Sequence, residues 1–374
     1  MAFSNKLEKL MGEVQKKFDK EVVSSASAMA DRDIITHHTG SLMLDLAIGN
    51  RLRAGIPEGR FMEIYGAESS GKTSVALLMI AARQAEEAEK AANDPNYQER
   101  MCVFVDAEHS LDLVLAMEYG VNLDKLILIN PEVAEVAMDV LDAFIRSGEV
   151  GLAIVDSVPA LVPASIEQAS FQQQHMGTLA RFMANVCQKL TGPAFMNKTT
   201  VLFINQIREQ IGRWSPTGVA TTTPGGRALK YYSTIRFEIK RAESIKDSSG
   251  IVGHQIKIRT VKNKIGTPFK EAYVNLIYGQ GIDRADELLQ IGIKSGIIRR
   301  GGAWYTCVDQ ETGEILSFEG EQMRTQGKDK MLENIRSFPS FFEYLENTIR
   351  GVKVELDDID EALLEDYKEA AKEG

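Results

Sequence analysis

Residues 61–73 read FMEIYGAESSGKT, and the architecture of the chain follows from this stretch. The apolar run Phe61–Tyr65 has strand character, and the loop Gly66–Thr73 matches the pattern G-x-x-x-x-G-K-[ST]. The segment SVALLMIAARQA that follows has helical spacing, so it places the positive end of a helix dipole beneath the loop. A glycine-rich surface turn would not need the Lys–Thr pair or the flanking elements. The stretch therefore predicts a site for a nucleoside triphosphate.

The chemistry of the loop assigns a role to its residues. The glycines let the backbone turn its N–H groups inward around phosphate oxygens. Lys72 reaches the β- and γ-phosphates, and the Thr73 hydroxyl is a ligand for Mg²⁺. We expect ATP and Mg²⁺ as cofactors, held by Gly66, Ala67, Glu68, Ser69, Ser70, Gly71, Lys72 and Thr73.

The charge of the chain is unevenly distributed. Its 374 residues carry a net charge of -10, which by itself does not indicate a nucleic-acid-binding protein. Residues 205–241, however, hold seven Lys or Arg against two Glu, and residues 351–374 hold nine acids against three bases. A local basic patch with an acidic tail differs from a uniformly acidic protein, because the patch can attract a polyanion.

Composition also sets an expected compartment. No apolar run is long enough to span a bilayer, and the N-terminus lacks the apolar region of a signal peptide. Cys102, Cys187 and Cys307 lie far apart without metal-type spacing, as expected of buried thiols in a reducing environment. We expect a cytoplasmic protein without membrane association.

Apolar strand candidates alternate with helix candidates from Ile34 to about Tyr278. Near-continuous apolar runs suit central strands that are covered on both faces by helices, and the intervening helices indicate parallel pairing. The last strands follow one another without helices and predict an antiparallel extension. We therefore predict an α/β fold with a mostly parallel sheet, whose strand candidates are Phe61–Tyr65, Cys102–Ala107, Gly151–Asp156, Thr200–Asn205, Thr234–Lys240 and Gln255–Asn263.

Changes in pattern divide the chain into four predicted parts. They are an N-terminal helix and linker (1–33), an ATPase core (34–282), a small α+β C-terminal domain (283–350) and an acidic tail (351–374). The N-terminal helix has an apolar face that packs either on its own core or on a neighbouring copy, and its spacing favours neither. Residues 86–100 are charged and predict a helix end followed by a surface loop.

Polar residues at strand ends are candidates for catalysis, because ligands of such sheets bind at the carboxyl ends of the strands. Asp156 ends one apolar strand and would hold the Mg²⁺ shell together with Thr73. Glu108 follows another strand and could activate the water that attacks the γ-phosphorus; the alternative is a Glu that only favours a helix dipole. Gln206 ends a third strand, where an amide could sense the γ-phosphate.

Two segments after these strands predict a nucleic-acid surface. Residues 208–223 form a long loop that is rich in Gly, Thr and Ser and ends in Pro224-Gly225-Gly226-Arg227. A second polar loop, residues 163–175, follows the Asp156 strand and would project from the same edge. Cations, an aromatic ring and a glycine pair suit a nucleic-acid backbone, whereas the alternative is an idle surface loop. Lys262 and Lys264 are either solvated edge charges or groups that reach phosphates across a subunit interface.

The ordered motifs GAESSGKT, FVDAEHSLD, AIVDSVPAL, HMGTLARFM, LFINQIR, TTTPGGRALKYY and VKNKIGTPFK resemble those of the bacterial RecA recombinases, from about Thr39 to Trp304. The resemblance implies a DNA-dependent ATPase that forms filaments on single-stranded DNA, pairs it with homologous duplex DNA and exchanges strands. Family partners would include single-strand-binding protein and a self-cleaving repressor. The resemblance also implies that the N-terminal helix packs on a neighbouring subunit.

The resemblance also implies roles for individual residues. Glu108 would activate water, Gln206 would sense the γ-phosphate, and Lys262 and Lys264 would reach ATP on the adjacent protomer. Together with Lys72 these are the predicted catalytic residues. Further nucleotide contacts are expected at Asp112, Asp156, Pro268 and Tyr278. The predicted DNA-binding residues are Met176, Arg181, Arg208, Arg213, Trp214, Gly225, Gly226 and Arg227.

The chain departs from the family pattern at several places. Leu115 stands where the family commonly has a tyrosine stacked near the adenine, and Gln188 replaces an expected basic DNA contact. Residues 86–100 resemble an insertion, and the similarity fades after Trp304. From the residues alone, a ring-forming helicase, a small-molecule phosphotransferase and a catalytically inactive recombination mediator are alternatives. The intact Lys72, Glu108 and Gln206 argue against the last of these.

Overall fold

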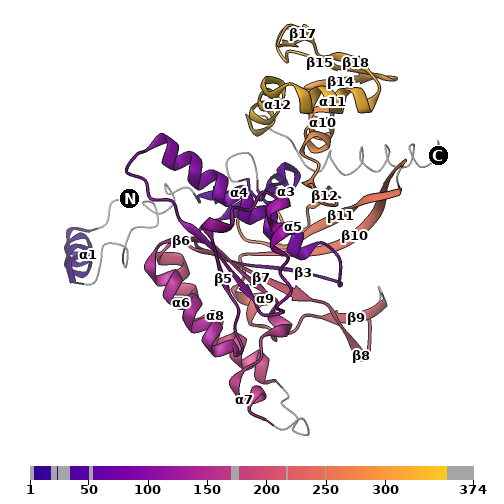
Figure 1. Cartoon of the computed structure of the whole chain (residues 1–374). Coiled ribbons are helices and arrows are strands. Elements are labelled where there is room, and N and C mark those ends of the chain that lie inside the picture. Colours follow the sequence, from indigo (N-terminus) through magenta and orange to yellow (C-terminus); the bar gives the residue numbers. More distant parts are fainter. Residues whose placement is uncertain are drawn as a thin grey trace. The chain divides into compact units, whose positions relative to one another are not determined.

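A nine-stranded sheet carries the apolar segments of the chain (Figure 1). The computed structural model describes residues 4–17, 23, 34–49, 54–169, 177–215, 218–248 and 250–351. The strand order is β13-β12-β11-β10-β3-β7-β6-β4-β5. The strands that pair in parallel are β3 (Phe61–Gly66), β4 (Met101–Asp106), β5 (Leu126–Ile129), β6 (Val150–Asp156), β7 (Thr200–Gln206) and β10 (Ile235–Asp247). The predicted α/β class with a mostly parallel sheet is confirmed.

The far edge of the sheet is antiparallel, as predicted for strands that follow one another without helices. It consists of β11 (Gly250–Asn263), β12 (Glu271–Ile277) and β13 (Gly281–Ile282). The strands β10 and β11 run further than the sequence patterns indicated, because they continue into polar residues as a hairpin beyond the sheet. The strands β5 and β12 were not among the predicted strands.

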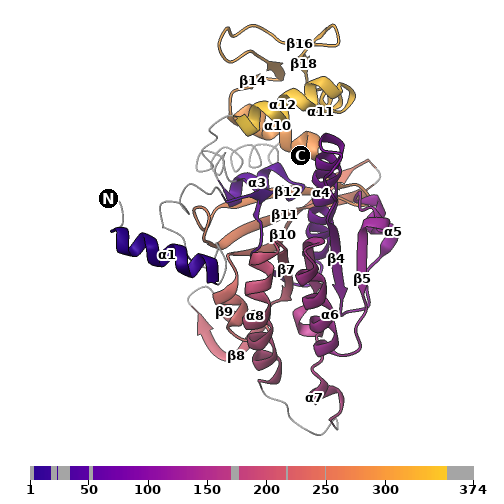
Figure 2. The same cartoon turned by 90° about the vertical axis from the view of Figure 1, so that its left-hand side faces the viewer.

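Both faces of the sheet are buried, which explains why its central strands are mostly apolar. On β4, Cys102 and Phe104 contribute to one hydrophobic cluster, whereas Val103 and Val105 contribute to the other. This alternation follows from the two-residue period of a strand. The first face is covered by α3 (Leu42–Ile48) and α4 (Lys72–Asn93), and the second by α6 (Ala134–Ser147) and α8 (Thr178–Met196). Figure 2 shows α6 and α8 lying side by side.

Shorter elements connect these layers. They are β1 (Thr36–His37), which pairs with β2 (Ile56–Pro57), the helices α5 (Leu113–Glu118), α7 (Ala164–Glu167) and α9 (Ala228–Tyr232), and the short 3₁₀ turns Leu123–Lys125 and Val158–Ala160. Helix α4 extends to Asn93, and an irregular segment follows it, as predicted for residues 86–100. A separate compact unit, Met1–Ile35, contains α1 (Asn5–Lys17).

The prediction of a loop at residues 208–223 is wrong, because these residues form an antiparallel hairpin. Strand β8 (Arg208–Ser215) pairs with β9 (Gly218–Thr222), with Arg208 opposite Thr222 and Trp214 opposite Val219. The β-branched Val219, Thr221 and Thr222 of β9 favour extended backbone, and pairing with β8 outweighs the Gly and Ser content that suggested a loop.

The C-terminal part has the mixed composition of helices and strands that the sequence predicted. It contains α10 (Arg284–Lys294), α11 (Lys328–Ser337), α12 (Pro339–Gly351) and the strands β14 (Ile298–Gly301), β15 (Trp304–Cys307), β16 (Ser317–Phe318), β17 (Glu321–Gln322) and β18 (Arg324–Gln326). The Leu42 N–H donates to Glu287 over 3.1 Å, and Arg284 pairs with Glu346 at 2.9 Å. One hydrophobic cluster runs from the sheet into these helices, and the predicted boundary at residue 283 stays a prediction. None of the described helices is long and apolar enough to cross a bilayer.

A buried polar network fixes the β1–β2 hairpin to α4 and to the segment before β4. His37 Nδ1 lies 2.6 Å from Glu86, and Arg100 Nη2 donates to Glu58 over 2.8 Å. Burial opposes the ionisation of Glu58, but hydrogen bonds from His37 and Arg100 outweigh it and lower its pKa to about 2. The charged carboxylate therefore stabilises the folded state.

This depressed pKa predicts a loss of stability in acid. A folded-state pKa below the unfolded value gives stability that is present above pH 4.5 and is lost as the pH falls toward 2. Because water screens this partly buried group, Glu58→Gln should lower the free energy of unfolding at pH 7 by about 1–2 kcal/mol, less than the full pKa shift would give. In urea titrations, the difference between the two proteins should shrink below pH 4.5. A difference that stays constant from pH 7 to pH 3 would contradict this assignment.

Candidate nucleotide-binding site

The loop between β3 and α4 requires glycine at two positions. A Cβ on Gly66 would overlap the Ile239 carbonyl oxygen on β10 and would lie 2.8 Å from Ser70 Oγ. Gly71 caps the N-terminus of α4 with a φ of 90°, which L side chains rarely adopt. The loop thus packs against the sheet while the first N–H groups of a 22-residue helix stay available to an anion.

The side chain of Lys72 folds back over the loop Gly66–Thr73. Its Nζ donates to the Ala67 carbonyl over 2.6 Å, and the Ser70 hydroxyl donates to the same oxygen over 2.8 Å. Burial lowers the pKa of the Lys72 ammonium, whereas the nearby carboxylates of Asp156, Glu108 and Glu68 oppose this shift. The ammonium is therefore held at the loop, where bound phosphates would compensate for its desolvation.

Asp156, at the end of β6, faces the start of α4. The Thr73 hydroxyl donates to Asp156 Oδ2 over 2.7 Å. Burial raises the pKa of Asp156 to about 6; the hydrogen bond from Thr73 and the charge of Lys72 oppose this, and the carboxylates of Glu108 and Asp106 add to it. Several carboxylates with only one lysine leave a net negative charge. A bound cation would reduce the repulsion among these carboxylates.

The donor set fits Mg²⁺ bound together with phosphates. Among the described residues, no group of three or more His, Cys, Asp or Glu could hold a metal ion on its own. Thr73 and Asp156 offer one hydroxyl and one carboxylate, both hard oxygen donors. Mg²⁺ in nucleotide sites usually takes one or two protein oxygens and completes its shell with phosphate and water.

Glu108 and Gln206 come together at the carboxyl edge of the sheet. The Gln206 Nε2 donates to Glu108 Oε1 over 3.2 Å, and the Ser157 hydroxyl donates to the same carboxylate oxygen. The order β3-β7-β6-β4 produces this meeting, because it aligns Gly66 with Gln206 and Asp106 with Asp156. A carboxylate, an amide and a lysine therefore surround the end of the loop where a γ-phosphate would lie.

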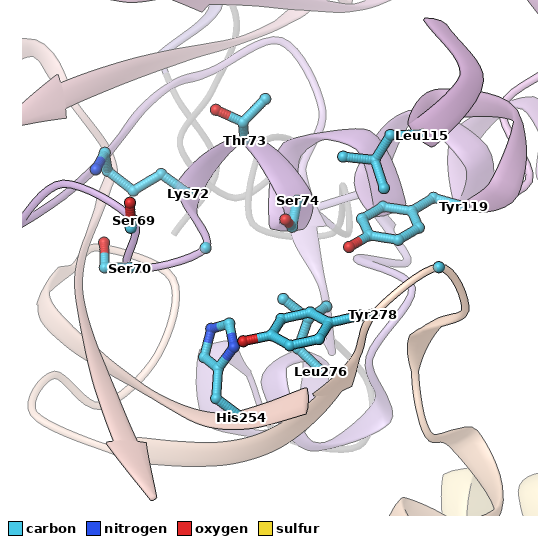
Figure 3. A pocket seen from close by; sticks show the side chains of 12 residues that line it. Ser69, Ser70, Lys72, Thr73, Ser74, Leu115, Tyr119, His254, Leu276 and Tyr278 are labelled. Carbon is cyan, nitrogen blue, oxygen red and sulfur yellow. The ribbon is translucent and has the colours of Figure 1, made fainter. Parts of the chain in front are cut away.

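A cavity of about 330 Å³ extends from the loop toward α5 and the β12 edge (Figure 3). Leu115 and the expected Tyr278 line it, and sequence reasoning missed five other members of its wall: Ser74, Tyr119, His254, Leu276 and Gly279. Only the fold brings these together, since they come from α4, from the end of α5, from β11, and from β12 with the turn that follows it. Asp112 is not among the lining residues. Its carboxylate caps α5 by accepting from the N–H groups of Val114 and Leu115.

Lys262, Lys264 and Pro268 lie at the opposite end of the sheet from the loop. In the register of the sheet, Lys262 on β11 lies opposite Arg236 on β10. Arg236 in turn lies beside Glu63, near the start of β3. This register places Lys262 about 10 Å along the strand direction from Gly66. Lys262 Nζ donates to the Lys230 and Tyr231 carbonyls over 2.7 and 3.0 Å, and Lys264 is exposed. Neither lysine nor Pro268 lines the cavity of its own chain.

The predicted DNA-binding residues divide into three groups. Arg181, Arg208 and Arg227 are exposed. Gly225 and Gly226 have φ of 79° and 74°, and a Cβ on them would lie 2.9 Å from Val158 and 2.7 Å from Ala180, so close packing on the 3₁₀ turn Val158–Ala160 and on α8 explains the two glycines. The structure describes only the backbone of Arg213 and Trp214, in β8, and Met176 lies outside the described residues.

The hairpin β8–β9 is tied to the nucleotide loop through β7. The Ile207 N–H donates to the Gly66 carbonyl over 3.3 Å, directly before β8 begins. The Asn205 amide donates to the Pro224 carbonyl over 3.1 Å, directly after β9 ends. Both ends of the hairpin are thus anchored at the strand end that carries Gln206.

The fold and this site define a P-loop nucleoside triphosphatase. The family model described as "RecA N-terminal domain" matches residues 5–283. A curated protein named "Protein RecA" from Halalkalibacterium halodurans is 38% identical over 344 residues, which cover 92% of this chain and 90% of that protein. "Protein RecA" from Bacillus thuringiensis is 40% identical over 308 residues, covering 82% and 85%. That from Heliobacterium modesticaldum is 38% identical over 354 residues, covering 94% of both.

The chain therefore belongs to the RecA family. Members of this family are DNA-dependent ATPases that act in homologous recombination and DNA repair, and this chain is one of them. The fold class and the recombinase function predicted from the ordered motifs are confirmed.

Gly66→Ala tests the packing of the loop. Because the added methyl group meets backbone on β10, the loop must move, and we expect affinity for a nucleoside triphosphate to fall at least about tenfold. Gly192→Ala is the matched control. That glycine lies inside α8, and nothing lies within 4 Å of the place that its added methyl group would take, so the change should leave affinity intact. Equal affinities for both variants in equilibrium titrations would refute the role of Gly66.

Proposed function

We propose that the site hydrolyses ATP with Glu108 as the group that accepts the proton of the attacking water. The observation that carries this proposal is the hydrogen bonding of Glu108 by both Gln206 and Ser157 at the edge that holds the P-loop. These donors orient one carboxylate oxygen and leave the other for water. Lys72 would neutralise charge on the β- and γ-phosphates. Thr73 and Asp156 would hold Mg²⁺, which when bound neutralises the same phosphates.

We further propose that Gln206 couples the γ-phosphate to DNA. In the structure, the Gln206 amide donates to Glu108. A γ-phosphate beside that carboxylate would compete for the same amide N–H. A shift of Gln206 toward phosphate would pull on β8, because Ile207 and Asn205 anchor both ends of the hairpin. The exposed Arg208, Arg227 and Arg181 would then meet the phosphates of single-stranded DNA.

The position of Lys262 and Lys264 supports a site that is completed by a second subunit. Both lysines lie at the end of the sheet away from their own P-loop, so they serve a nucleotide only if another copy presents its loop to them. Head-to-tail contacts of this kind generate a helical filament when they do not close. Hydrolysis would then depend on assembly.

Other partners and the compartment remain predictions. The resemblance suggests a single-strand-binding protein and a self-cleaving repressor as partners. Burial raises the pKa of Cys102, Cys187 and Cys307 to about 12, so these thiols are unreactive and their state does not report the compartment. We propose a cytoplasmic location from the sequence alone.

Single-stranded DNA should stimulate ATP turnover, and the stimulation should fall as salt is raised, because phosphate contacts release counterions. Lys72→Ala should abolish turnover in a coupled ATPase assay. Lys90→Ala serves as a control on the same helix, since Lys90 lies in its last turn and is about half exposed.

Turnover that is indifferent to DNA at low salt would contradict the coupling and favour a small-molecule phosphotransferase. Joint molecules from homologous substrates separate a recombinase from a helicase, which would unwind a fork instead.

A mixing experiment tests the cross-subunit lysines. Lys264→Ala and Lys72→Ala should each be inactive alone. The first lacks the lysine that reaches the neighbouring nucleotide, and the second lacks a working P-loop. In an equimolar mixture, random head-to-tail assembly pairs an intact loop with an intact lysine at about a quarter of interfaces, so about a quarter of wild-type turnover should return. A mixture as inactive as its components, with filaments still formed, would contradict the proposal.

A further inference from the structure

The nucleotide cavity of this chain holds an aromatic ring one helical turn away from the expected place. Leu115 stands where the resemblance predicts a tyrosine, and Tyr119 lines the same cavity. Tyr119 ends α5, and its N–H donates to the Leu115 carbonyl over 3.1 Å. Residues four apart on a helix lie on one face, so the two side chains share a wall of the cavity.

Tyr119 is held rigidly in that wall. Its side chain is 7% exposed and belongs to the main hydrophobic cluster. Its Cδ1 lies 3.6 Å from the position that a Cβ on Gly281 would take, so β13 packs against the ring edge. Figure 3 shows Tyr119 and Tyr278 on opposite sides of the cavity. These two rings, together with the apolar side chains of Leu115 and Leu276 that also line the cavity, offer a site that suits a planar base.

His254 on β11 supplies the polar feature of this end of the cavity. It is 5% exposed, and within the described part of the chain neither ring nitrogen has a hydrogen-bond partner. Its ring centroid lies 5.7 Å from that of Tyr278, and its Nε2 lies 3.9 Å from the position that a Cβ on Gly71 of the P-loop would take. The imidazole thus lies between the phosphate end and the site for the base.

The unsatisfied nitrogens of His254 indicate what kind of ligand group they face. Burial, with a smaller contribution from Arg241, lowers the pKa of His254, which favours the neutral ring. A neutral imidazole has one N–H donor and one acceptor nitrogen. Phosphate oxygens only accept, whereas ribose hydroxyls and the edge of a purine both donate and accept. A nucleoside satisfies both nitrogens, and a polyphosphate does not.

We propose that Tyr119 and His254 bind the nucleoside part of the nucleotide, with Tyr119 replacing the aromatic ring that is missing at Leu115. This inference rests on the proposed ATP site and deepens it. The base packs between Tyr119 and Tyr278, and His254 hydrogen-bonds the nucleoside.

The test compares ATP with inorganic tripolyphosphate, which has the phosphates but no nucleoside. Equilibrium binding of each is measured by calorimetry on the full chain without DNA. Tyr119→Leu should weaken ATP binding about tenfold and leave tripolyphosphate binding unchanged. Tyr305→Leu, in β15 and 6% exposed, is a burial-matched control outside the cavity and should leave both affinities unchanged.

Exchanging the residues at positions 115 and 119 is a more stringent test. Leu115→Tyr combined with Tyr119→Leu returns the ring to the other turn of the same helix face and should restore ATP affinity to within about threefold of the wild type. Tyr119→Phe, which keeps the ring, should bind ATP at least about fivefold more tightly than Tyr119→Leu. His254→Leu should weaken ATP about fivefold and spare tripolyphosphate, and His254→Gln, with a donor and an acceptor, should recover part of the loss.

The outcomes separate this inference from the function on which it rests. If the wild type binds neither ligand, the proposed ATP site fails. If the wild type binds both and Tyr119→Leu and His254→Leu bind ATP normally, only the nucleoside assignment fails. Equal losses of ATP and tripolyphosphate would also overturn it, because they would mean a distorted P-loop. Unfolding temperatures of the free variants identify any that do not fold, and Tyr119→Phe and His254→Gln then decide.

Discussion

The parallel register of four strands is the constraint on which the site depends. Because β3, β7, β6 and β4 are neighbours and run the same way, their carboxyl ends reach one edge together. That edge collects the P-loop, Asp156, Glu108 and Gln206 from four separate segments of the chain. Apolar residues on both faces of these strands hold the register, since a slip by one residue would exchange every buried side chain between two different helical layers.

The electrostatics of that edge are incomplete without a ligand. Asp106, Glu108 and Asp156 lie close enough to influence one another, and burial raises the pKa of Asp156 to about 6. Lys72 is the cation among them, and burial lowers its pKa. Such an arrangement costs stability in the free protein, and a nucleotide with its cation offsets that cost. The same sheet leaves Lys262 and Lys264 at its other end. In the proposed function, the two halves of a catalytic site would therefore lie on two faces suited to head-to-tail assembly.

Sequence reasoning worked best where chemistry is local. The loop Gly66–Thr73, the strand that precedes it and the helix that follows it are contiguous, so residue types alone specified their roles. The reasoning was weaker for residues 208–223, because β-branched residues in a glycine-containing stretch form a hairpin only if its two halves pair. It also did not show that Asp112 caps a helix, and the nucleotide contact expected there stays a prediction.

The sequence by itself determined the α/β class, the P-loop and the membership of the RecA family, because these follow from short-range patterns and from motif order. The tertiary structure alone decided which distant residues share a cavity. Tyr119 lies far along the chain from His254 and Tyr278, and no local pattern relates the three. The end of α5 lies against Gly281 of β13 and the turn at Gly279, which brings the three together, and long-range packing of this kind leaves no periodic signal along the sequence.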